Sequence, residues 1–176
     1  MASLLTACLT GDIPAEAALV VSPAGPTPAT RRAAAMGVSV DVVPPGDGYG
    51  QRLLHTLEQN RIDWICLAGY MLLLPLEVVT QYERRILNIH PALLPKFGGK
   101  GMYGRHVHEA VLASGVVESG CTVHYVTPIY DEGEIILQRT CPVLRDDTVD
   151  TLADRVLDLE QIVYPQALKL VITGHE

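Results

Sequence analysis

The chain has 176 residues, of which 48% are hydrophobic and 19% charged, a composition typical of a folded domain with its own core and not of a disordered chain. Its formal charge of -7 argues against non-specific nucleic-acid binding, and no apolar run approaches the about 20 residues of a membrane-crossing helix. The four cysteines form no CxxC pair, and the first residues lack the layout of a signal peptide. We therefore expect a single domain spanning residues 1–176, located in the cytoplasm, with no membrane or nucleic-acid partner.

Strand-like and helix-like segments alternate along the sequence. Short apolar or β-branched runs predict strands at Ala18–Ser22, Val38–Val43, Ile62–Ala68, Ile86–His90, Cys121–Thr127 and Glu134–Val143. Helical patterns occupy Pro28–Met36, Gln51–Asn60, Pro75–Tyr82, His106–Ala113 and a longer segment from Thr148 onward.

Local signals mark several element ends. Thr27 before Pro28 suits a helix N-cap, and Asp147 is expected to cap the last helix. Pro165 is expected to kink that helix or to begin a second one. The alternation predicts an α/β fold with a doubly wound, mostly parallel sheet, in which ligands bind beyond the carboxyl ends of the strands.

The most informative stretch is Leu87–Pro91. Asn88 and His90 are two residues apart on a predicted strand that Pro91 ends, so their side chains share one face at a carboxyl edge. An amide can donate to a developing oxyanion and an imidazole titrates near neutrality, which together suit acyl transfer. Spacing alone leaves open a purely structural Asn beside a hydrogen-bonded His.

Asp131 follows the predicted strand Cys121–Thr127 through a turn. Its carboxylate could accept a proton from His90, fix the tautomer of the ring and raise its pKa. The same residues also fit a solvated acidic turn. We expect His124, in the middle of the strand, to be a packed or supporting histidine rather than a catalyst.

Two further motifs resemble a nucleotide site and a metal site, but neither has the sequence context that such a site requires. The segment Gly99–Gly104 is a literal GxGxxG, but Pro95–Phe97 precedes it where a dinucleotide fingerprint needs a strand. The segment His106–Glu109 lacks the partner spacing of a metal site, so we expect a surface pair of histidines and no metal. The apolar loop Leu67–Pro75 fits either ordinary core or the wall of a flat ligand pocket.

These motifs, in this order, resemble the glycinamide ribonucleotide formyltransferases, the folate-dependent enzymes of purine synthesis. The resemblance runs from about Leu4 to Ala167, and its most specific segments are Leu67–Met71, Leu87–Pro95 and Val123–Val126, followed by Asp131, Gly133, Glu160 and Tyr164–Pro165. Methionyl-tRNA formyltransferases and formyltetrahydrofolate hydrolases share the Asn-x-His core, but Pro91–Phe97 is more similar to the purine enzymes.

The resemblance implies that the amine of glycinamide ribonucleotide attacks the formyl carbon of 10-formyltetrahydrofolate, with no metal involved. Asn88 would stabilise the oxyanion, His90 would act as general acid and proton carrier, and Asp131 would hold His90. It implies a folate site formed by Met71, Leu72, Leu73, Leu74, Asn88, Val126, Thr127 and Tyr130. It also implies that Ile89, Pro91 and Glu160 contact the ribonucleotide, with the N-terminal part of the domain towards that substrate and the C-terminal part towards folate.

The chain also departs from the family pattern. It begins inside the expected first helix, so we expect it to lack the family's first strand and the glycine-rich turn that holds the substrate phosphate, which would leave two neighbouring strands with open edges. Leu72 stands where arginine is frequent, Leu157 where a polar contact is common, and Gln161 in place of a histidine. Two alternatives follow: a non-catalytic folate-binding remnant, or a formyltetrahydrofolate hydrolase. We expect a monomer or a weak homodimer.

Overall fold

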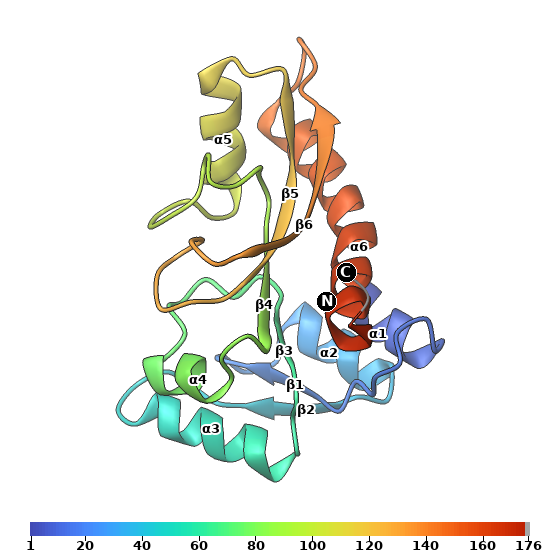
Figure 1. Ribbon diagram of the computed structural model, residues 1–176, viewed down its shortest axis with the longest axis vertical. Coiled ribbons are helices and arrows are strands. Elements are labelled where there is room, and N and C mark those ends of the chain that lie inside the picture. Colours follow the sequence, from blue (N-terminus) through green and yellow to red (C-terminus); the bar gives the residue numbers. More distant parts are fainter. Residues whose placement is uncertain (175–176) are drawn as a thin grey trace.

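The computed structural model describes residues 1–174, which form an α/β fold (Figure 1). The helices are α1 (Ala2–Leu9), α2 (Pro28–Ala35), α3 (Tyr49–Gln59), α4 (Leu76–Gln81), α5 (Arg105–Ser114) and α6 (Val149–Thr173). The strands are β1 (Leu19–Ser22), β2 (Ser39–Val42), β3 (Ile65–Leu67), β4 (Ile86–His90), β5 (Glu118–Tyr125) and β6 (Ile135–Pro142). The fold class predicted from the alternation is confirmed.

The strands form two sheets. β1 and β2 pair in parallel, and the second sheet has the order β3-β4-β5-β6. β3 is parallel to β4, whereas β5 runs antiparallel to both β4 and β6. The last two strands are therefore neighbours, and within residues 1–174 both β1 and β3 have a single hydrogen-bonded neighbour.

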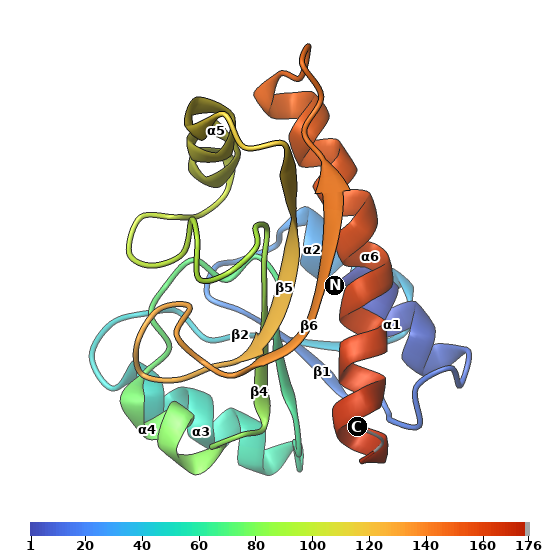
Figure 2. The same cartoon turned by 45° about the horizontal axis from the view of Figure 1, so that its top comes forward.

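β4 is covered on both faces. Ile86 and Leu87 are 1% and 0% exposed, and they belong to different hydrophobic clusters because successive side chains of a strand point to opposite faces. The first cluster lies under α6, which runs along β5 and β6 in both views (Figures 1 and 2). The second contains residues of α3 and α4, which lie side by side. The strand that carries Asn88 and His90 is thus held from both sides.

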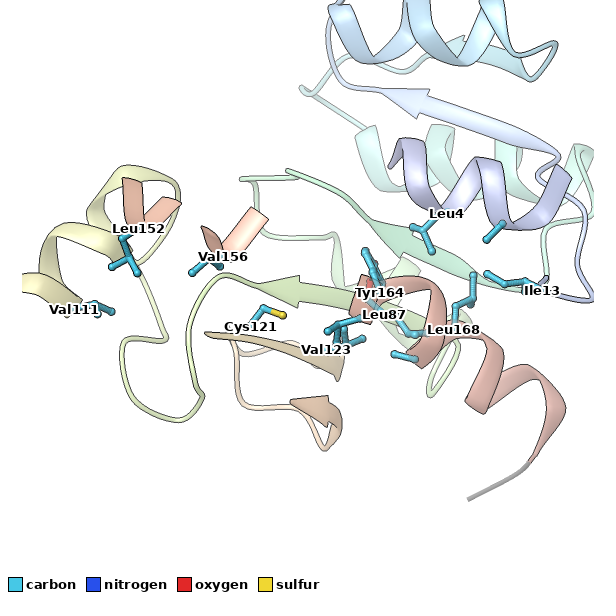
Figure 3. Packing of buried hydrophobic residues seen from close by; sticks show 13 residues of the cluster. Leu4, Ile13, Leu87, Val111, Cys121, Val123, Leu152, Val156, Tyr164 and Leu168 are labelled. Atoms are coloured by element: carbon cyan, nitrogen blue, oxygen red, sulfur yellow. The ribbon is translucent and has the colours of Figure 1, made fainter. Parts of the chain in front are cut away.

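Tyr164 joins the long helix to the centre of the sheet. Its ring packs against Leu87 in the core (Figure 3), and its hydroxyl lies 2.8 Å from the carbonyl oxygen of Leu67 and 2.9 Å from that of Leu87. The phenolic hydrogen can be donated to either carbonyl. One side chain of α6 therefore contacts the last residue of β3 and the second residue of β4.

Most predicted elements are present. In the last helix, the N-cap residue and the effect of the internal proline differ from the prediction. The N-cap of α6 is Thr148, whose hydroxyl accepts from the Thr151 N–H, so the prediction of Asp147 as the cap was wrong. The two carboxylate oxygens of Asp147 instead accept hydrogen bonds from the two terminal guanidinium nitrogens of Arg155. Pro165 does not begin a second helix, because α6 continues through it to Thr173.

Candidate active site

Asn88 and His90 share one face of β4, next to Pro91, which cannot donate to a sheet ladder. Opposite them on β5, Asn88 pairs with His124 and His90 pairs with Thr122. Because cross-strand partners point to the same face, four polar side chains gather at the end of the strand. His90, Thr122 and His124 are buried, whereas Asn88 is partly accessible.

His124 fixes the orientation of the Asn88 amide. The Nδ1 atom of His124 lies 2.8 Å from the carbonyl oxygen of Tyr125, to which it donates its proton. The Nε2 atom is then left with a lone pair, and it accepts an N–H from Asn88 Nδ2 at 3.2 Å. The second N–H of the Asn88 amide stays available to a ligand.

His90 is held between a backbone carbonyl and a carboxylate. Its Nε2 lies 2.8 Å from the carbonyl oxygen of Phe97, which can only accept a hydrogen bond, so Nε2 carries the ring proton and donates it in that bond. Its Nδ1 faces Asp131 Oδ2 at 3.5 Å, and the other carboxylate oxygen lies 3.6 Å from His124 Nε2. The backbone N–H of Gly99 donates to Asp131 Oδ2 at 2.9 Å. The structure thus brings together Asn88, His90 and Asp131.

Burial sets the protonation of this group. Burial lowers the pKa of His90 below its ordinary value, although the Asp131 carboxylate and the Phe97 carbonyl act in the opposite direction. Asp131 raises the pKa of His90 as expected, but the net direction is the reverse of that expectation. Burial would raise the pKa of Asp131, yet the nearby His124 ring, the hydrogen bond from the Gly99 N–H and the charge that His90 can carry bring it below its ordinary value. Near neutral pH, a neutral imidazole therefore faces an ionised carboxylate.

Contacts that the sequence did not indicate hold the loop after β4. The Thr122 hydroxyl donates to the Ala92 carbonyl at 2.7 Å and accepts from the Leu94 N–H at 3.1 Å. Gln138 Nε2 donates to the Leu94 carbonyl at 2.8 Å and to Thr122 Oγ1 at 2.9 Å. The only sequence signal for Gln138 was a polar residue that follows apolar residues within a strand.

Two loops carry the residues expected to bind a flat ligand. Met71, Leu72 and Leu73 are 65%, 44% and 50% exposed, whereas Leu74 is buried in the second core cluster. Val126 packs against the same cluster, so the two loops share one support. In the second loop Thr127 closes a turn with Ile129, and Tyr130 is 37% exposed.

The residues expected to contact a ribonucleotide lie apart from each other. Pro91 is partly exposed just after β4, and the Ile89 side chain packs against the first core cluster, on the opposite face from Asn88. Glu160 belongs to α6, on that same opposite side, where it faces the Met1 amine. Burial raises the pKa of Glu160 to about 7, and the amine acts against this rise. No contact joins Glu160 to Asp131 or His90 among the interactions found in the described part of the chain.

The two histidines at the start of α5 differ from the expectation of a surface pair. His106 is exposed, but His108 is 6% exposed, and its Nδ1 has no hydrogen-bond partner within residues 1–174. Two residues on a helix are about 200° apart, so the pair cannot share a face. His108 is also close enough to His90 for electrostatic coupling, and burial lowers the pKa of His108.

The described residues also bear on metals and membranes. Among residues 1–174, no group of three or more His, Cys, Asp or Glu side chains is arranged to hold a metal ion. No helix within the same residues has both the length and the apolar composition needed to cross a membrane.

The family is decided by a comparison with known sequences. The sequence profile of the family described as Formyl transferase matches residues 1–168. The chain belongs to the formyl transferase family. The matched range includes Asn88, His90 and Asp131.

This formyl transferase is similar to plant proteins that are named phosphoribosylglycinamide formyltransferase. It is 41% identical over 167 residues to the chloroplastic phosphoribosylglycinamide formyltransferase of Arabidopsis thaliana, covering 92% of this chain and 57% of that protein. It is 50% identical over 117 residues to the Vigna unguiculata protein of the same name, covering 66% of this chain and 38% of that protein. The chain thus spans little more than half, or less, of these relatives.

A solved structure shows the same fold. The crystal structure of glycinamide ribonucleotide transformylase 1 from Symbiobacterium toebii superimposes with a TM-score of 0.92 and 38% sequence identity. The match covers 98% of this formyl transferase and 82% of that chain. The arrangement of strands and helices around Asn88 and His90 is therefore that of a known glycinamide ribonucleotide transformylase.

Proposed function

We propose that this chain transfers the formyl group of 10-formyltetrahydrofolate to the amine of glycinamide ribonucleotide, a step of purine synthesis. The observation that carries this proposal is the convergence of Asn88, His90 and Asp131 at the end of β4. Family membership and the names of the relatives support the choice of reaction.

The proposed reaction joins the amine nitrogen of the ribonucleotide to the formyl carbon and breaks the bond between that carbon and N10 of the folate. Asn88 would donate its second N–H to the formyl oxygen as negative charge develops on it. His124 uses the first N–H and keeps the amide group directed, so little reorganisation is needed when the charge appears. Such a fixed donor favours the transition state over the ground state.

His90 and Asp131 would move the proton. The attacking amine loses a proton and N10 of the folate gains one, so a carrier between the two balances the reaction. The lone pair on His90 Nδ1 faces Asp131 at 3.5 Å, where an ionised carboxylate stabilises a proton placed on that nitrogen. Burial opposes a lasting positive charge on the ring, so the proton is readily released.

The exposed apolar loop residues fit the flat ring system of a folate. We propose that Met71, Leu72 and Leu73 cover one side of it and that Leu74 supports them from the core. The other side would be lined by the backbone and side chains of Val126, Thr127 and Tyr130. Asn88 would lie at the end of the folate site where the formyl group is transferred. We further propose that Ile89 and Pro91, through their backbone, and Glu160 contact the ribonucleotide.

Product analysis tests this proposal. The purified protein is incubated with 10-formyltetrahydrofolate, with and without glycinamide ribonucleotide. The products are then separated by chromatography and identified by mass spectrometry. We expect formylated ribonucleotide to form only when the acceptor is present. Formate release without acceptor would instead identify a hydrolase. Calorimetric binding of a folate analogue without binding of the ribonucleotide would identify a folate-binding remnant.

Location in the cytoplasm and a monomer or weak homodimer stay predictions, and two relatives are named as chloroplastic.

A further inference from the structure

The loop between β4 and α5 presents one carbonyl group to His90. Phe97, a residue with a side chain, has a φ of 58° there, in the left-handed region that costs such residues free energy. Its carbonyl oxygen nevertheless lies 2.8 Å from His90 Nε2. A backbone held in this conformation needs support from its surroundings.

The first support is Thr122, whose hydroxyl has no bonding capacity left. Its O–H is donated to Ala92, and its lone pairs accept the Leu94 N–H and a Gln138 N–H. Thr122 is 0% exposed, so these bonds do not compete with water. The start of the loop is fixed to β5.

The second support is Gln138 on the neighbouring strand β6. Both hydrogens of its amide are used, one on the Leu94 carbonyl and one on Thr122 Oγ1, at 2.8 and 2.9 Å. Leu94 is buried, and its side chain lies so close to Gly98 that a Cβ there would be 2.5 Å from Leu94 Cδ2. Displacement of Leu94 would therefore move the turn that contains Phe97.

We propose that Gln138 is a positioning residue for His90, acting through Leu94 and the Phe97 carbonyl. The two hydrogen bonds that Gln138 donates keep the loop in one conformation. In that conformation the Phe97 carbonyl accepts a hydrogen bond from the Nε2–H of His90, and His90 Nδ1 faces Asp131. The inference rests on the proposed function because it assigns His90 the movement of a proton. It extends that function to a side chain on a strand that contributes no group to the reaction itself.

Substitutions of Gln138 separate hydrogen bonding from packing. Gln138→Glu keeps the shape but loses both N–H donors, and Gln138→Met keeps the length without polar atoms. Arg139→Met is the matched control, since Arg139 is the next residue of β6 and is exposed. The two measurements are the titration of His90, followed by NMR of ¹⁵N-labelled imidazoles, and the steady-state rates.

We expect both Gln138 variants to fold and to show a lower His90 pKa, because the Phe97 carbonyl that favours the protonated ring is no longer held in place. We expect kcat to fall about 10- to 100-fold, the typical effect of misplacing a catalytic group by about 1 Å, with KM changed far less. Arg139→Met should match the wild-type protein in both measurements.

An unchanged His90 titration in folded Gln138→Glu and Gln138→Met would overturn the inference, as would an equal effect of Arg139→Met. The titration does not depend on turnover. A wild-type protein that fails to transfer formyl groups contradicts the proposed function, whereas an unmoved His90 pKa contradicts the role of Gln138.

Discussion

The Asn88 amide illustrates how one neighbouring side chain decides what another can do. An amide rotated by half a turn would direct its oxygen, not its N–H, at a developing oxyanion. The His124 ring excludes that rotamer, because its Nδ1 proton is donated to Tyr125 and its Nε2 can therefore only accept. His124 was expected to be a packed or supporting histidine, and this contact shows that it orients the Asn88 amide.

Asp131→Asn tests the electrostatic link to His90. The Asp131 carboxylate raises the pKa of His90 against the effect of burial, so removal of its charge leaves burial with less opposition. We expect the limb of the kcat–pH profile that reports His90 to move to lower pH and the maximal rate to fall. A profile with unchanged limbs would show that Asp131 is not the partner of His90.

The raised pKa of Glu160 predicts that the stability of the fold depends on pH. Its folded pKa of about 7 lies above the ordinary value of 4.5, so the folded state binds the proton more tightly. The contribution of protonated Glu160 to the free energy of unfolding is fully present below about pH 4.5 and is lost as the pH rises through about 7, by about 3 kcal/mol in all. We expect Glu160→Gln to unfold at a higher urea concentration than the wild type at pH 8, with a smaller difference at pH 5.

The control for this prediction is Glu83→Gln, at an exposed position. Its unfolding midpoint should follow that of the wild type at both pH values. A Glu160→Gln protein with the wild-type dependence on pH would mean that Glu160 is ionised without cost in the folded state.

At the scale of elements, the termini of β4 were predictable and the course of α6 was not. Pro91 ends the strand by its own covalent structure, so Ile86–His90 agrees with the sequence prediction residue for residue. Pro165 costs a helix interior about 3 kcal/mol by the same chemistry. Buried residues on both sides of it, Tyr164 and Ala167, belong to one core cluster, and their packing outweighs that local cost.

The loop after β4 marks another limit of prediction. Apart from the bond between their own side chains, Thr122 and Gln138 contact backbone N–H and carbonyl groups, which nearly every residue carries, so no sequence pattern distinguishes the ones that are bound. His108 is different, because Val107 and Val111 on the same helix are buried and helical spacing could have placed it towards the core.

Tyr164→Phe tests the connection between α6 and the sheet. The substitution keeps the ring but leaves the carbonyl groups of Leu67 and Leu87 without the phenolic donor. We expect a loss of about 1–3 kcal/mol in the free energy of unfolding, measured by urea denaturation. Tyr103→Phe, at an exposed ring, should change it by less than about 0.5 kcal/mol, and equal effects of the two would contradict the role of the buried hydroxyl.

At the scale of the whole molecule, two clusters of apolar side chains clamp β4 between α6 on one face and α3 with α4 on the other. A site at the end of such a strand rests on a rigid support, which is what fixed donors require. The sequence places Asn88 and His90 on one face through the strand period and the proline, and the structure brings Asp131 to within 3.5 Å of His90. Sequence reasoning gave no measure of how deeply His90 is buried, since burial depends on the loop packed over it.

The kinetics of Asn88→Ala and His90→Ala test the central claim most directly, with circular dichroism and thermal melting to confirm that each variant is folded. Loss of an oxyanion donor should lower kcat about 10²–10³-fold, and loss of the proton carrier about 10²–10⁴-fold. A folded His90→Ala protein that forms formylated ribonucleotide at the wild-type rate would contradict the assignment of this cluster as the site of formyl transfer.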